Sequence, residues 1–300
     1  MRRGPGITIM RASLRRLAIG LAALVAAGTA QAQTVVVGAR GTTEQQLVAE
    51  MTGQILKARG IPASRRAASG PAALRQALEA GQVDVAWDYT GAALATVHTI
   101  AERLDGAGTY ARVKELDAAR GLVWLNPSRA NATAALAMRA GETKGVGSLT
   151  ELAARIKGGD ALRLGCDAFC TRPEGLAALQ QAYGLEFGRE QVVRMEAGLV
   201  YGALRDRQVD VGLVVATDGR VPAYGFALLK DDNGFFANQT LAPVVRRQAL
   251  DRNPRLAEAL NGLAARLDDT VVGKLAASVD VDRKTVEEVA AGFLKGMGLL

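Results

Sequence analysis

The chain of 300 residues carries the same order of secondary-structure signals twice. The word Gln-Val-Asp-Val occurs at residues 82–85 and again at 208–211, each time after a helical segment and before an apolar strand. Around each copy the sequence reads strand, helix, strand, helix, strand, which predicts a mainly parallel sheet with helices on both faces. We therefore expect two similar α/β lobes.

In the first half, an apolar strand at residues 34–37 precedes a Gly-bounded loop and a helix. Leu47 and Met51 belong to an apolar series at helical spacing, and Thr42 or Thr43 is expected to cap this helix with a glutamine three residues on. The second half repeats this plan.

The second half has a predicted strand at residues 161–164, then a loop and a second helix. Thr171 is expected to cap that helix, with Glu174 three residues on, and Leu176 and Leu179 form part of its apolar side.

Residues 1–32 form a leader with a basic head, an apolar run at 17–27 and small residues at Ala30 and Ala32. These features are typical of a signal peptide. A transmembrane anchor needs about 20 apolar residues, roughly twice the length of this run. We expect export to a bacterial periplasm, cleavage near Ala32, and no membrane insertion of the mature chain.

The leader carries five of the 37 basic residues and none of the 30 acidic ones, so the rest of the chain has a net charge near zero. Basic residues there form no run longer than a pair. Neither nucleic acid nor an anionic membrane is therefore expected as a partner.

The two cysteines, Cys166 and Cys170, lie close together in GCDAFCTRPEG. In an oxidising compartment they could form a short-loop disulfide, and the sequence leaves open whether they do. Two thiols without nearby histidine fall short of the four ligands of a structural zinc site, so no metal is expected.

Ligands of open parallel sheets bind beyond the carboxyl ends of the strands, where helix N-termini point. Four loops occupy these positions in the predicted lobes: 38–44, 88–91, 166–172 and 215–220. Two lobes facing each other would bring the loops around one cleft. The pattern therefore predicts a binding site between the lobes.

Several segments resemble the substrate-binding proteins of osmoprotectant ABC importers: GARGTTEQQLVAEM, ALEAGQVDVAWDYTGAAL, TRPEGLAALQQAYGL, ATDGRVPAYGFALLKDDNGFFANQTLAPVVR and VEEVAAGFLKGMGLL. The resemblance implies a two-lobe type II periplasmic-binding fold with the ligand cleft between the lobes. It also implies a monomer that closes on glycine betaine, choline or a related small zwitterion or cation. The closed form would deliver this solute to a membrane permease.

With this fold, lobe 1 is expected to comprise residues 33–128 and 238–300, and lobe 2 residues 129–237. The two crossovers should lie near 126–133 and 236–243.

The resemblance also implies ligand contacts. It places carboxylate-binding cations at Arg40 and Arg172 and one cage tyrosine at Tyr89. The family's other three cage tyrosines are replaced, by Ala134, Val215 and Gln239. Losing three cation–aromatic contacts, at about 0.5 to 2 kcal/mol each, would weaken a methylammonium ligand. A binding protein of the same fold for another small acid or amino acid is therefore the alternative.

Polar groups of the same loops complete the predicted site, and they could hydrogen-bond a smaller or more polar zwitterion: Thr42, Thr43, Thr90, Asn131, Thr133, Thr217, Asp218, Gln239 and Thr240. Several of these residues have structural interpretations as well. Arg172 could pair with Glu174, and Asp218 could pair with Arg220. Trp87 and Trp124 could add aromatic surface, although a tryptophan in or beside a buried strand is more often part of the core.

Catalysis and gene regulation are the remaining classes. His98 is the only histidine, and the chain contains no GxSxG, P-loop, HExxH or dinucleotide fingerprint. We expect no enzyme activity and no cofactor, with an enzyme on the same fold as the remote alternative. A regulator would begin with a DNA-binding helix-turn-helix, whereas this chain begins with an export signal.

Overall fold

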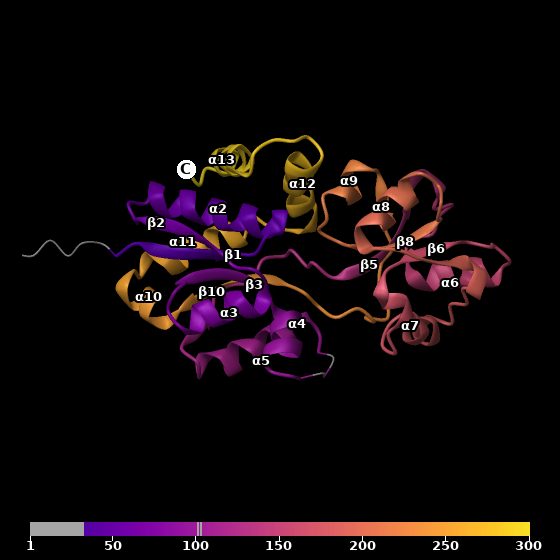
Figure 1. The fold of residues 1–300 in the computed structure, drawn as a ribbon, viewed down its shortest axis with the longest axis horizontal. Helices are drawn as coiled ribbons and strands as arrows, with labels where there is room; N and C mark the ends of the chain where they lie inside the picture. The colour runs from indigo at the N-terminus through magenta and orange to yellow at the C-terminus, as the bar shows by residue number, and fades with distance from the viewer. Residues whose placement is uncertain (1–32, 101, 103) are drawn as a thin grey trace, which may run out of the picture. The chain divides into compact units, whose positions relative to one another are not determined.

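The computed structural model describes residues 33–100, 102 and 104–300. The predicted signal peptide and its cleavage near Ala32 lie outside the described residues. Residues 34–300 form one compact unit. This unit contains two five-stranded sheets, each with helices on both faces (Figure 1).

The first sheet has the strand order β2-β1-β3-β10-β4. Its strands are β1 Val35–Ala39, β2 Ala63–Ala67, β3 Val85–Tyr89, β4 Leu122–Trp124 and β10 Leu241–Arg246. β2, β1 and β3 are parallel, whereas β10 runs antiparallel to both β3 and β4. The parallel strands are connected by α2 Thr43–Ala58 and α3 Pro71–Glu79.

The second sheet repeats this arrangement with the order β7-β6-β8-β5-β9. Its strands are β5 Ala134–Arg139, β6 Leu164–Cys166, β7 Val192–Arg194, β8 Val211–Val215 and β9 Phe226–Leu228. β7, β6 and β8 are parallel, β5 is the antiparallel strand, and α7 Leu176–Tyr183 and α8 Ala197–Arg205 connect the parallel strands. The predicted strand–helix repeat is confirmed in both halves. The repeat did not predict the antiparallel strands β5 and β10.

The remaining helices complete the layers around the sheets. They are α4 Thr90–Ala92, followed by a π-turn at Ala93–Val97, α5 Gly106–Ala118, α6 Leu149–Lys157, α9 Arg220–Ala223, α10 Arg247–Arg252, α11 Arg255–Ala264, α12 Asp269–Asp280 and α13 Val286–Gly296. In Figure 1, α2, α12 and α13 lie on one side of the first sheet and α3, α4 and α5 on the other.

Strand β3 shows why the first sheet is buried on both faces. Successive side chains of a strand point to opposite faces. Trp87 packs in the core under α2, while Ala86 packs in the core under α3 and α5. Trp87 and Trp124 are both core residues, and each indole N–H is satisfied: Trp87 donates to Thr52 Oγ1 at 2.9 Å and Trp124 to Asp117 Oδ2 at 2.6 Å.

The chain passes from the first sheet to the second between β4 and β5 and returns between β9 and β10. These two segments are hydrogen-bonded to each other: Leu241 N donates to Ala130 O at 2.9 Å and Ala132 N to Gln239 O at 3.1 Å. Gly91 packs tightly beside them, because a Cβ at this position would lie 2.1 Å from Asn238 O. The two crossings therefore form one joined strip.

The predicted helix caps were only partly right. Thr42 is the residue before α2, but its side chain makes no capping hydrogen bond. Thr171 is not a cap of α7, which begins at Leu176. The cause is Pro173, since a residue before proline is disfavoured in helical conformation, and Arg172 is extended with φ −74° and ψ 144°.

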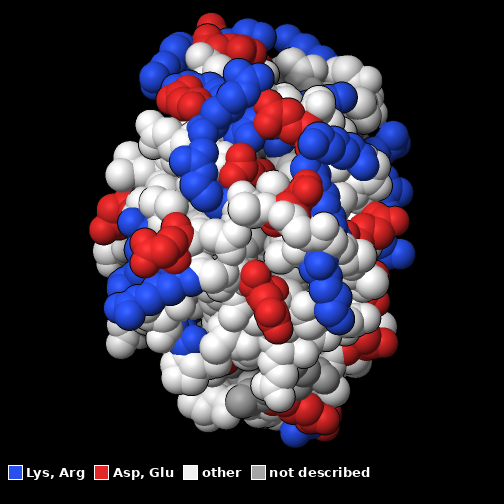
Figure 2. Space-filling model, turned by 90° about the vertical axis from the view of Figure 1, so that its right-hand side faces the viewer, with Lys and Arg blue, Asp and Glu red and all other residues white. Residues whose placement is uncertain are grey.

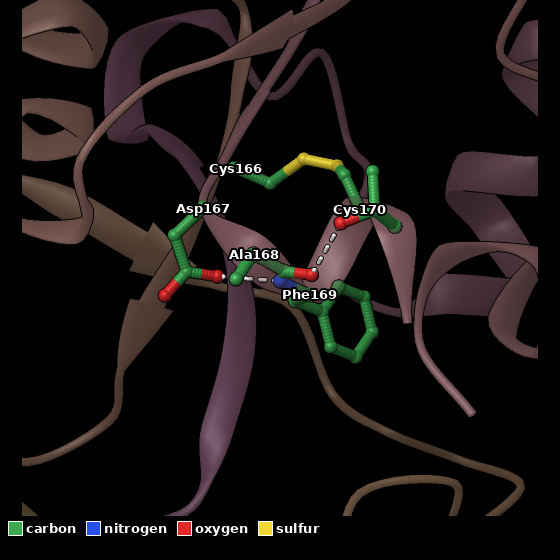
Figure 3. Close-up of a disulfide and its surroundings, with 6 residues drawn as sticks. Cys166, Asp167, Ala168, Phe169 and Cys170 are labelled. Atoms are coloured by element: carbon green, nitrogen blue, oxygen red, sulfur yellow. Dashed lines mark hydrogen bonds between the residues drawn. A yellow bond between two sulfur atoms is a disulfide. The ribbon is translucent and has the colours of Figure 1, made fainter. Parts of the chain in front are cut away.

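A disulfide joins Cys166 and Cys170, whose Cα atoms lie 6.0 Å apart (Figure 3). The residues between them form a tight turn. Phe169 N donates to Asp167 Oδ1 at 2.9 Å, and Thr171 Oγ1 donates to Ala168 O at 3.1 Å. The loop after β6 is thus held by covalent and local hydrogen bonds.

Candidate functional site

A cavity of about 460 Å³ lies where loops and helices of both sheets meet. Its walls come from the start of α2, the β3–α4 junction, the first crossing segment, the loop after β8, the second crossing segment and α12. The lining residues are Thr42, Thr43, Glu44, Tyr89, Ala92, Ala132, Ala134, Val215, Thr217, Asp218, Gly219, Gln239, Ala276 and Asp280.

Glu44, in the first turn of α2, reaches two hydroxyl groups from different parts of the fold. Tyr89 Oη donates to its Oε1 at 2.6 Å, and Thr217 Oγ1 donates to its Oε2 at 2.7 Å. Burial raises the pKa of the Glu44 carboxyl, while the two hydroxyl donors and the charge of Arg40 act in the opposite direction. Glu44 is therefore a half-buried carboxylate at the cavity wall.

Tyr89 ends β3, and its ring forms the aromatic wall of the cavity. The Arg40 guanidinium carbon lies 4.8 Å from the ring centroid, within the range of a cation–π contact. Burial raises the pKa of the Tyr89 phenol, and the Glu44 carboxylate adds to this shift. Nε of Arg40 and both amide atoms of the neighbouring Gln45 are buried without a hydrogen-bond partner.

The second sheet contributes Thr217 and Asp218 from the loop after β8. Thr217 is 2% exposed. Asp218 is paired with Arg220, whose Nη2 lies 2.8 Å from Asp218 Oδ2, and the Arg220 guanidinium carbon lies 3.6 Å from the Tyr201 ring centroid. The charge of Asp218 is thereby balanced by a neighbouring cation.

Six of the predicted ligand residues line the cavity: Thr42, Thr43, Tyr89, Thr217, Asp218 and Gln239. Ala134, Val215 and Gln239, the positions at which the resemblance implied replaced tyrosines, line it too. The other six predicted ligand residues do not: Arg40, Thr90, Asn131, Thr133, Arg172 and Thr240.

The polar side chains of the two crossing segments form hydrogen bonds with other residues of these segments. Asn131 Oδ1 accepts from Gln239 N at 2.7 Å, and Thr133 Oγ1 donates to Ala237 O at 2.8 Å. Thr240 Oγ1 donates to Asn238 Oδ1 at 2.6 Å. These groups position the backbone beside the cavity.

Arg172 lies apart from the cavity, on the loop closed by the disulfide. Its side chain is 57% exposed and stands 3.9 Å from a Glu174 carboxylate oxygen. The guanidinium carbon lies 5.9 Å from the Phe169 ring centroid.

Sequence reasoning missed Glu44 and Asp280 as cavity residues. Glu44 lay within the quoted GARGTTEQQLVAEM segment, next to two predicted contacts, so the segment itself carried the signal. Asp280 is at the end of α12, and its Oδ1 accepts from Thr43 Oγ1 at 2.6 Å. Only the fold brings these two residues together, because they are 237 positions apart.

Among the described residues, no group of three or more His, Cys, Asp and Glu side chains could hold a metal ion. None of the helices in that part of the chain is long and apolar enough to cross a membrane. On the face shown in Figure 2, basic and acidic side chains are interspersed with uncharged ones, so neither sign forms a continuous field there.

A family model described as the substrate binding domain of ABC-type glycine betaine transport systems matches residues 33–296. The chain belongs to this family. Proteins of this family are extracytoplasmic binding components of transporters and not enzymes. The family predicted from the sequence is thereby confirmed.

Named relatives agree with the assignment. The glycine-betaine-binding protein of Pseudomonas aeruginosa is 41% identical, with 97% of this chain and 96% of that protein covered. The glycine betaine-binding protein YehZ of Escherichia coli is 30% identical over 89% of this chain and 92% of its own length. The structure of apo YehZ superposes with a TM-score of 0.84, covering 90% of this chain and 100% of that one at 28% identity. The predicted two-sheet binding-protein fold is confirmed.

Proposed function

We propose that this protein is the exported solute-binding component of an ABC importer for glycine betaine-like compounds. In this proposal the leader is removed near Ala32, and the mature chain works as a monomer in the periplasm. It takes up one small solute, delivers it to a membrane permease, and does not act on nucleic acid. The observation that supports this most directly is a cavity walled by both sheets in a chain of this family.

The ammonium end of the solute is proposed to lie against Tyr89. An aromatic face attracts a methylated cation that is too bulky to hydrogen-bond. Glu44, beside the ring, adds a negative charge. Ala134, Val215 and Gln239 provide no further aromatic surface at the lining positions. Because each missing aromatic contact is worth about 0.5 to 2 kcal/mol, we expect weaker binding than a full aromatic cage gives.

The acidic end of the solute is proposed to bind at the start of α2. The first turn of a helix has unpaired backbone N–H groups, and Thr42 does not cap them with its side chain. Arg40, whose guanidinium contacts the Tyr89 ring, has a buried Nε without a hydrogen-bond partner. Arg172 lies outside the cavity, so its proposed contact requires the loop of residues 166–175 to move toward the cavity on closure.

A second candidate is a small amino acid or another small acid. The polar lining favours it, since Thr42, Thr43 and Gln239 offer hydrogen-bonding groups where a full aromatic cage would not. Such a ligand would depend on these groups more than on Tyr89.

A calorimetric and thermal-shift panel tests the proposal. Glycine betaine, choline, carnitine and proline are each added to the purified protein at several concentrations. A ligand that binds only the folded state raises the melting temperature in proportion to the logarithm of its concentration. We expect a concentration-dependent rise with at least one of the methylated ammonium compounds. No shift and no heat of binding with any of them would contradict the proposal, and a response to proline alone would favour the second candidate.

A further inference from the structure

We propose that Glu44 is a positioning residue that connects the two sheets across the cavity. One of its carboxylate oxygens holds the hydroxyl of the aromatic wall, and the other holds a hydroxyl of the second sheet. The inference rests on the proposed function where it concerns ligand affinity, but its structural part can be tested without ligand.

The first connection orients Tyr89. Glu44 belongs to the first turn of α2 and Tyr89 to the end of β3, so the 2.6 Å hydrogen bond links two elements of the first sheet. Tyr89 is otherwise placed by its packing in the core and by the Arg40 contact. An acceptor at the hydroxyl fixes how the ring is turned toward the cavity. Hydrogen bonds to an ionised acceptor are the stronger kind.

The second connection crosses between the sheets. Thr217 lies just after β8, and its hydroxyl donates to Glu44 Oε2 at 2.7 Å. The three residues joined by these two hydrogen bonds, Tyr89, Glu44 and Thr217, all line the cavity. A change at Glu44 therefore acts on the wall of the first sheet and on the loop of the second sheet together.

The loop that carries Thr217 is seated closely on α12. A Cβ at Gly219 would lie 2.3 Å from Ala277 N and 2.6 Å from Ala276 C, so only glycine allows this approach. A Cβ at Gly273 of α12 would lie 3.7 Å from Thr217 O. The Glu44–Thr217 hydrogen bond thus lies beside a second contact between the two halves, and both hold the same loop.

The Glu44 carboxylate forms no salt bridge in the described part of the chain, although the charge of Arg40 favours its ionised form. No Lys or Arg stands within 4.0 Å of it in the described part of the chain, whereas Asp218, the nearby carboxylate of the second sheet, is paired with Arg220. Its two hydroxyl donors are consequently its main stabilising contacts. Removing either donor should disturb the carboxylate, and removing the carboxylate should release both hydroxyls.

The experiment compares four variants by ligand affinity: Glu44→Ala, Glu44→Gln, Tyr89→Phe and Thr217→Val. The probe is whichever of glycine betaine and choline binds the wild type more tightly. Losing one hydrogen bond to a charged group should weaken binding by about 10-fold, and Glu44→Ala by about 100-fold. Glutamine has an oxygen for Tyr89 and an amide N–H for Thr217 Oγ1, so Glu44→Gln should recover most of the affinity.

Double variants give the decisive readout. In a Glu44→Ala background, Tyr89→Phe and Thr217→Val should each change affinity by less than about twofold, because their partner is already gone. A full 10-fold effect of Thr217→Val in that background would overturn the proposal. If Glu44→Ala does not fold, the same cycle is made in a Glu44→Met background, which keeps a side chain of similar length without the carboxylate, and a full 10-fold effect of Thr217→Val in that background would overturn the proposal.

A ligand-free measurement separates this inference from the proposed function. The amide of Asp218, which donates to Val215 O at 3.1 Å, reports on the loop by hydrogen exchange. We expect faster exchange in Glu44→Ala and Thr217→Val and unchanged exchange in Tyr89→Phe. Thr143→Val, whose hydroxyl donates to Ala140 O outside the cavity, is the matched control. Equal exchange in all variants would overturn the inference even if no tested compound binds.

Discussion

The two sheets have the same strand order, yet the loops at their ligand-facing edges differ in length and chemistry. After β1, three residues lead directly into α2, a helix of 16 residues whose first turn lines the cavity. After β6, the chain makes a disulfide-closed turn and Arg172 before α7 begins at Leu176. With the same topology, the first half places the N-terminus of a helix at the cavity, whereas the second half has a disulfide-closed loop at the corresponding position.

The ends of β3 and β8 show the same inequality. Tyr89 ends β3 with an aromatic ring, a hydrogen bond to Glu44 and a cation–π contact with Arg40. Val215 ends β8 with an aliphatic side chain that is 42% exposed. Recognition of the solute is therefore expected to depend mainly on the first half, with the second half closing the cavity through Thr217.

The largest expected effect separates the two arginines. If the solute's carboxylate binds near the start of α2, Arg40→Ala should weaken glycine betaine by about 2 to 5 kcal/mol. Arg172→Ala should cost less, because this side chain is exposed and away from the cavity, whereas Arg40 does not line the cavity itself but contacts the lining residue Tyr89. Calorimetric titration of both variants checks the difference. An equal or larger loss in Arg172→Ala would show that the second half contributes as much as the first.

Removing the disulfide tests whether the loop after β6 is structural. Cys166→Ser with Cys170→Ser should lower the free energy of unfolding by about 2 kcal/mol, as loop-closure entropy predicts for so short a ring. Ligand affinity should stay within twofold, because neither cysteine lines the cavity. Denaturant unfolding and titration of the same sample give both values, and a large loss of affinity would contradict the comparison.

A third change gives the second half an aromatic side chain at the cavity, as the first half has with Tyr89. Val215→Tyr adds an aromatic ring at a lining position that comes from the second sheet. A cation–π contact should strengthen binding of choline or glycine betaine by about 0.5 to 2 kcal/mol. Val215→Leu is the matched control, since it adds apolar volume without a ring. Equal gains in both variants would mean that apolar contact, and not the aromatic face, is limiting.

The smallest expected effect is a pH dependence carried by Glu44. Burial and the charge of Asp269 raise the pKa of Glu44. The hydroxyl donors Tyr89 and Thr217 and the charge of Arg40 lower it, and the net shift is upward. A cationic ligand favours the ionised carboxylate, so affinity should fall as pH is lowered through this pKa and level off above it. Choline has no titrating group in the acidic range, so its dissociation constant from pH 7.5 to 4.5 reports on the protein. Glu44→Gln should flatten this profile.

Much of the fold could be predicted because the signals are local. Apolar strands and helical periodicity repeat in both halves, and the family segments lie at the strand ends. β5 and β10 could not be recognised in this pattern, because each pairs with strands that are distant in the sequence, β5 with β8 and β9, and β10 with β3 and β4. Thr171 does not cap α7, because Pro173 shifts the start of this helix to Leu176.

The site was predicted less completely. Tyr89, Thr43 and Thr217 were named from their segments and line the cavity. Glu44 lay between named residues, but its role depends on a hydroxyl 173 positions away. Asp280 and Ala276 come from a C-terminal helix with no motif of its own, and only tertiary packing brings it to the cavity.

The most direct measurement is the titration of glycine betaine and choline into the wild type and into Tyr89→Ala. We predict saturable one-to-one binding by the wild type to at least one of them, and an affinity at least about 10-fold lower in Tyr89→Ala at a temperature at which that variant is still folded. Identical dissociation constants in the two proteins would show that the solute does not bind against this wall. The cavity between the sheets would then not be the recognition site.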